Sequence, residues 1–213
     1  MTGLILALLL AAGVTTPAAA QRSPAGQETP DFGAEAASGE VQAFAARTLA
    51  TNDHRDLPFV IIDKRAAKVF VFDRRGRITG AAPALLGLAI GDDSVPGIGQ
   101  RRLATIQPAE RTTPAGRYQA SLGHDFEQDI LWIDYDGALS LHRVIAGNPK
   151  DRRAARLASE SLLDNRVSYG CINVPAAFYD DVVKPAFTGT VGIVYILPET
   201  RPIADVFPAL LAR

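Results

Sequence analysis

The sequence contains few of the residues that carry most covalent and metal chemistry. Its 213 residues include one cysteine, three histidines, one tryptophan and one methionine. A single cysteine excludes an intramolecular disulfide, and the scattered histidines show no metal-ligand spacing, so we expect no zinc site. Positive and negative charges nearly cancel, leaving a net charge of −1. This balance argues against nucleic acid as a partner and against a general attraction to membrane surfaces.

Long hydrophobic runs are also missing, except for one at the start of the chain. Residues 4–14 are almost entirely apolar, and alanines 18–20 precede Gln21 as at a signal-peptide cleavage site, although the usual basic residues before the run are absent. A run of about a dozen residues is too short to cross a bilayer, which needs ~20. We therefore expect residues 1–20 to be a leader, no membrane span, and an exported protein of the periplasm or cell wall. The alternative is a buried helix after a wrongly assigned start.

The rest of the chain has the composition of one globular domain, with 47% hydrophobic and 21% charged residues. Residues 21–57 are expected to form a flexible spacer and a short helix that begins behind Ser38. Residues 58–198 are expected to form the main domain. Residues 199–213 are a C-terminal tail whose apolar residues could form a packing helix.

Short β-strands dominate the expected main domain. Residues 59–62 and 68–72 are rich in β-branched and aromatic residues, and residues 191–197 form a last strand. The clearest hairpin surrounds Asp136 and Gly137, a dipeptide typical of tight β-turns. A helix is expected to begin at Pro175. The pattern therefore predicts a mainly β fold with a few short helices.

Cys171 lies in a sequence context that favours a reactive thiol over an inert one. Gly170 permits a tight backbone beside it, and the expected helix after Pro175 would place the positive end of a helix dipole nearby. A nucleophilic thiol also needs a base. His142 shares one face of its expected strand with Ser140, away from its leucine neighbours. The other two histidines, His54 and His124, are expected to be solvated.

These residues resemble the signature of the L,D-transpeptidases of the YkuD type. That signature is a histidine, an intervening stretch, and then Ser/Thr-His-Gly-Cys-hydrophobic-Asn. The upstream residues 113–118 likewise resemble the family's Thr-Pro-x-Gly-x-Tyr segment. The chain departs from the pattern at Tyr169, which replaces a histidine, and in a longer, arginine-containing stretch at 146–166. The matching positions here are His142 followed by Ser168, Gly170, Cys171, Ile172 and Asn173.

The resemblance implies a β-sandwich of the L,D-transpeptidase type and acyl transfer on peptidoglycan stem peptides, without metal or organic cofactor. Cys171 would be the nucleophile and His142 its base, oriented by the backbone carbonyl of Arg143. The amides of Gly170 and Cys171 would form the oxyanion hole. The remaining residues of interest are expected to bind substrate or to shape the turn: Ser168, Tyr169, Asn173 and Arg166, the last as a partner for a substrate carboxylate.

Several other interpretations stay open at this stage. Cys171 could be an inert core thiol and His142 a structural histidine. The same fold could serve a hydrolase of wall peptides, or a peptidoglycan-binding protein that lost activity through Tyr169. A sortase-like enzyme would need an arginine-bearing strand where the helix after Pro175 is expected. Papain-like proteases place the cysteine before the histidine, the reverse of the order found here.

Overall fold

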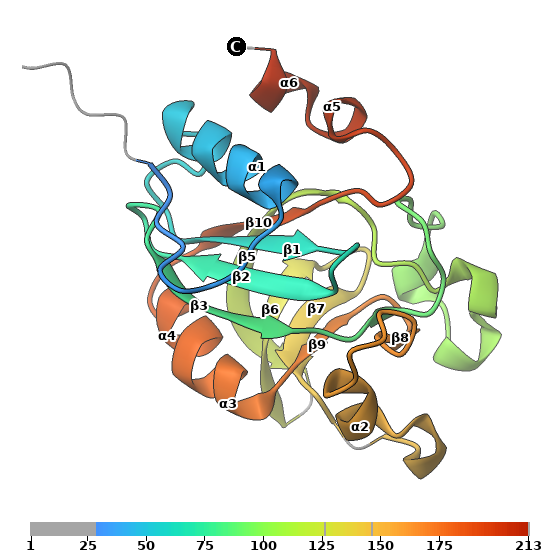
Figure 1. The fold of residues 1–213 in the computed structure, drawn as a ribbon. Helices are drawn as coiled ribbons and strands as arrows, with labels where there is room; N and C mark the ends of the chain where they lie inside the picture. Colours follow the sequence, from blue (N-terminus) through green and yellow to red (C-terminus); the bar gives the residue numbers. More distant parts are fainter. Residues whose placement is uncertain (1–28, 126, 146, 213) are drawn as a thin grey trace, which may run out of the picture.

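The computed structural model describes residues 29–125, 127–145 and 147–212 (Figure 1). The expected leader, residues 1–20, lies outside these described ranges. No helix within them is both long enough and apolar enough to cross a membrane.

The mainly β prediction is confirmed. Most strands belong to one 8-stranded sheet with the order β3-β2-β1-β10-β5-β6-β7-β9, while β4 and β8 form a separate 2-stranded sheet. Within the large sheet, β1 pairs in parallel with β10, and β7 in parallel with β9. The strands are β1 (Phe59–Asp63), β2 (Lys68–Phe72), β3 (Ile78–Pro83), β4 (Leu86–Gly87), β5 (Gly116–Asp125), β6 (Gln128–Asp134), β7 (Leu139–Arg143), β8 (Arg166–Ser168), β9 (Ile172–Val174) and β10 (Gly192–Ile196).

The large sheet curls, so that its two halves share one apolar core. Val60 of β1 and Val71 of β2 belong to the same buried cluster as Leu131 of β6 and Leu141 of β7. Two halves of a sheet packed face to face in this way give the sandwich-like core that was expected. A helical segment closes one side of this core (Figure 1) and consists of α3 (Ala176–Phe178), a π-helical turn (Tyr179–Val183) and α4 (Lys184–Phe187).

The opposite face of β1, β2 and β10 carries a second apolar cluster. Side chains alternate along a strand, so Phe59 and Ile61 point to this face while their neighbours point to the first core. Helix α1 (Gly39–Ala50) covers the cluster with the buried side chains of Val41 and Phe44. Its expected N-cap is present: the Val41 amide donates to the Ser38 hydroxyl at 3.2 Å.

The chain ends also lie against this second cluster. Phe32, in the described end of the expected spacer, packs edge-on against Phe72 with ring centroids 5.2 Å apart. The tail forms two short helices beside α1 (Figure 1), α5 (Ile203–Val206) and α6 (Pro208–Leu211), and it buries Phe207 and Leu210. Residues before and after the main domain thus complete its outer layer.

Two long connections flank β7, which carries His142, and the turn before β9 that carries Cys171. The stretch from β4 to β5 winds through three short 3-10 turns, and the stretch from β7 to β8 contains a 3-10 turn (Pro149–Asp151) and α2 (Arg153–Leu157). The second connection contains the arginine-containing stretch noted in the sequence, residues 146–166. The turns of the first connection are Ile98–Gln100, Leu103–Thr105 and Pro108–Glu110.

Candidate active site

Parallel pairing of β7 with β9 places His142 and Cys171 on the wall of one cavity, where Sγ contacts the Ser140 hydroxyl and the Ala138 carbonyl oxygen, each at 3.5 Å. His142 lies opposite Asn173 in the register, and Cys171 directly precedes β9. Both residues are partly buried. The expectation that a helix dipole lies close to the Cys171 thiol is wrong, because the residues of β9 separate the thiol from the helix that follows Pro175. Interactions with side chains must therefore activate the thiol.

The orientation of the His142 ring makes Nε2 the basic nitrogen. Nδ1 lies 2.7 Å from the backbone carbonyl oxygen of Arg143, and a carbonyl can only accept, so Nδ1 carries the proton. The neutral ring then has its lone pair on Nε2, which faces the Asn173 amide nitrogen at 3.4 Å. This is the tautomer that a base next to a thiol requires.

The environment of Cys171 favours the thiolate. Burial raises the pKa of the thiol, but the interaction with His142 and the hydroxyl of Ser140 outweighs burial, and the pKa lies below its usual value. The Ser140 hydroxyl lies 3.5 Å from Sγ and can donate to it. For His142, burial lowers the pKa, yet Cys171 and the Arg143 carbonyl raise it above its usual value, although the charge of Arg153 lowers it. Both shifts favour transfer of the thiol proton to the ring.

A tight turn presents the thiol. The Ser168 hydroxyl accepts from the Gly170 amide at 3.0 Å and donates to the carbonyl of Cys171 at 2.7 Å. Gly170 has φ 136°, and a Cβ there would lie 2.7 Å from the Thr112 carbonyl oxygen, so only glycine fits. Ser168 and Gly170 are therefore parts of the turn itself.

This turn leaves one of the two expected oxyanion donors free. The Gly170 amide is bound to Ser168, so in this conformation it does not point to a substrate oxygen. The Cys171 amide has no partner among the described residues. A carbonyl attacked by Sγ would meet the Cys171 amide first.

Cys171 lines two cavities. The first, of about 470 Å³, lies beneath the 3-10 turns of the β4–β5 connection and is mainly apolar, with Tyr169 and Ile98 in its wall. The second, of about 840 Å³, contains His142, Ser140 and Trp132. A substrate can therefore reach the sulfur from the base side or from the Tyr169 side.

The remaining expected residues are placed as follows. The ring of Tyr169 stacks under the guanidinium of Arg111, whose central carbon lies 4.0 Å from the ring centroid. Arg166 is not brought to the thiol, because it forms an ion pair with Glu199 and donates to the Lys64 carbonyl at 2.9 Å. The Arg143 side chain bonds Asp129 and Asp180.

The two other histidines take no part in the site. His124 lies exposed at the end of β5, as expected. The expectation that His54 is solvated is wrong: it is 3% exposed, and its Nε2 lies 3.0 Å from the Arg74 carbonyl. Within residues 29–212, as far as they are described, no group of three or more His, Cys, Asp or Glu side chains could hold a metal ion.

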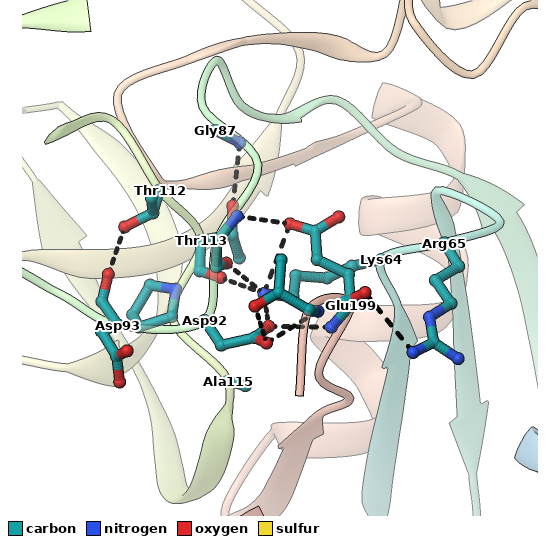
Figure 2. Close-up of polar contacts among 12 residues, drawn as sticks. Lys64, Arg65, Gly87, Asp92, Asp93, Thr112, Thr113, Ala115 and Glu199 are labelled. Atoms are coloured by element: carbon teal, nitrogen blue, oxygen red, sulfur yellow. Dashed lines mark hydrogen bonds and ion pairs between the residues drawn. The ribbon is translucent and has the colours of Figure 1, made fainter. Parts of the chain in front are cut away.

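A buried lysine network behind the turn escaped the sequence analysis (Figure 2). The Thr113 hydroxyl donates to the Gly170 carbonyl at 2.7 Å, and the Thr113 carbonyl accepts from Lys64 Nζ at 2.8 Å. Lys64 also bonds Asp92 at 2.7 Å, and neither side chain is exposed to solvent. Asp92 accepts from the amides of Glu199, Thr200 and Arg201. The Thr-Pro-x-Gly-x-Tyr segment was the one sequence signal for this network.

Comparisons with known proteins give only distant structural matches. No family model and no curated protein matches this sequence. The helical cell shape determining protein Pgp2 (K307A mutant) from Campylobacter jejuni aligns over 73% of this chain and 55% of its own, with 14% identity and a TM-score of 0.44. LD transpeptidase LdtMt1 in complex with imipenem aligns over 66% and 58%, with 14% identity and a TM-score of 0.35. The chain spans little more than half of either protein, and similarity at this level carries no argument about function.

Proposed function

We propose that this protein is a cysteine acyltransferase acting on peptidoglycan stem peptides, an L,D-transpeptidase. The observation that carries the proposal is that Cys171, which lines two cavities, shares one of them with a His142 ring held in the Nε2-basic tautomer. The choice of stem peptides rests on the motif from His142 to Asn173. No metal enters the proposed reaction.

The proposed reaction has two acyl-transfer steps. Nε2 of His142 takes the thiol proton, and Sγ of Cys171 attacks the carbonyl that precedes the terminal D-residue of the donor peptide. The oxyanion is bound by the Cys171 amide, and the imidazolium then protonates the leaving amine. An acceptor amine next attacks the thioester, gives its proton to Nε2 and releases the crosslinked peptide together with the thiol.

A hydrolase of the same fold is the second candidate. Water in place of the acceptor amine would release a shortened peptide, and the 840 Å³ cavity beside His142 is open enough to admit it. A protein that binds peptidoglycan without reaction is the third, but the lowered thiol pKa argues for chemistry at Cys171.

Incubation of the mature protein with purified disaccharide-tetrapeptides tests these candidates. The expected product is a crosslinked dimer, formed with release of the terminal residue and seen by liquid chromatography and mass spectrometry. Cys171→Ala should abolish it, and His142→Ala should reduce the rate by at least about 100-fold. Shortened peptides without dimers would establish the hydrolase, and unchanged peptides with folded protein would contradict both enzyme proposals.

A further inference from the structure

The insertion between β7 and β8 reaches the catalytic pair through one side chain. Arg153, at the start of α2, donates from Nη1 to the Asn173 carboxamide oxygen at 2.9 Å. The Asn173 amide nitrogen lies 3.2 Å from the Cys171 carbonyl and 3.4 Å from His142 Nε2. Asn173 is 1% exposed, so its carboxamide has no water to bind instead. One arginine of the insertion is thus two hydrogen bonds away from the base and the nucleophile.

The placement of Arg153 is itself fixed within the insertion. Its Nε lies 3.3 Å from an Asp151 carboxylate oxygen, and its side chain is 13% exposed. Asn148 caps the turn that holds Asp151 by accepting from the Lys150 amide at 3.0 Å. Arg152 differs from its neighbour, since it is exposed and its side chain makes no hydrogen bond or ion pair among the described residues. Of this adjacent pair, only Arg153 points to the site.

We propose that Arg153 is a positioning residue through which the insertion sets the proton affinity of the catalytic pair. The proposal deepens the proposed function and rests on it for its role in turnover. Because Arg153 occupies the Asn173 oxygen, the carboxamide must turn its N–H groups to the Cys171 carbonyl and to Nε2. An N–H group facing Nε2 favours the neutral ring and disfavours the imidazolium.

The charge of Arg153 lowers the pKa of His142, and the same charge would lower the pKa of the thiol. A cation near the ring makes imidazolium a stronger acid, which helps it to protonate the leaving amine, and a cation near Sγ stabilises the thiolate. Loss of Arg153 would raise the pKa of His142 and that of Cys171. Without Arg153 the Asn173 carboxamide would also be free to flip and turn its oxygen to Nε2, which would raise the pKa of His142 further. The side chains that share this environment are Cys171, Ser140 and Asn173 around the ring, Asp125 and Glu127 on the cavity wall, and the Asp129–Arg143–Asp180 group beside β7.

The test is the pH dependence of Cys171 alkylation by iodoacetamide, together with the His142 titration followed by NMR. Arg153→Met should shift both titrations to higher pH and lower the alkylation rate at pH 7 several-fold. Arg153→Lys, which keeps the charge, should fall between Arg153→Met and the unchanged protein. Arg152→Met is the matched control and should leave both titrations unchanged.

The outcomes separate this proposal from the proposed function. Unchanged titrations in folded Arg153→Met, or equal shifts in Arg152→Met, would overturn the role of Arg153. If Arg153→Met fails to fold, the same two titrations are recorded for Arg153→Lys, and unchanged titrations in that variant would overturn the role of Arg153. An ordinary thiol profile in the unchanged protein would contradict the proposed function instead, and the His142 titration would still decide on Arg153.

Discussion

At the residue scale, activation of Cys171 depends on two side chains from one strand. Ser140 and His142 are two positions apart on β7 and so point to the same side, where both line a cavity with Cys171 and Ser140 contacts the thiol. The sequence already indicated this shared face. It could not indicate the contact between Ser140 and Sγ, because that depends on how β9 pairs with β7.

The role of Ser140 can be tested by removing its hydroxyl. Ser140→Ala should raise the thiol pKa and slow alkylation of Cys171 at neutral pH several-fold, because the thiolate loses a donor in a buried place. At a pH above the thiol pKa of both the unchanged protein and Ser140→Ala, the two alkylation rates should converge. Ser121→Ala, an exposed serine on β5, serves as the control. An unaltered pH profile in Ser140→Ala would show that the hydroxyl does not stabilise the thiolate.

At the element scale, local patterns predicted several of the longer strands but missed β3, β8 and β9. The hairpin at Asp136 and Gly137, the cap at Ser38 and the strand of residues 68–72 all occur as expected. The apolar stretch after Ala84 forms only the short β4, and β9 was missed because three residues are too few to show a period. These short elements are fixed by tertiary contacts, which a local pattern does not contain.

The buried pair of Lys64 and Asp92 is the clearest of these tertiary contacts. Lys64→Met should lower the free energy of unfolding by about 3 kcal/mol, because it leaves a buried carboxylate without its cation and two carbonyls without a donor. Lys68→Met, in a pair with Glu35 that is partly exposed, should cost at most about 1 kcal/mol. Chemical denaturation of both variants measures the difference. Equal losses would contradict a special role for the buried pair.

At the scale of the whole molecule, the site is assembled from parts that lie far apart in the sequence. His142 comes from β7, Cys171 from the turn before β9, Thr113 from the β4–β5 connection and Arg153 from the insertion. The motif was enough to nominate the nucleophile and the base. Arg166 shows the limit of that approach, because it lies two residues before Ser168 of the motif in the sequence, but its side chain pairs with Glu199.

The central claim is that Cys171 is a nucleophile activated by His142, and covalent trapping tests it most directly. We would incubate the mature protein with a carbapenem, whose strained lactam carbonyl acylates such thiols, and record the intact mass. The account predicts one adduct per chain, absent in Cys171→Ala and formed much more slowly in His142→Ala. Folded protein with a titratable thiol and no adduct, or an adduct formed equally fast in His142→Ala, would contradict it.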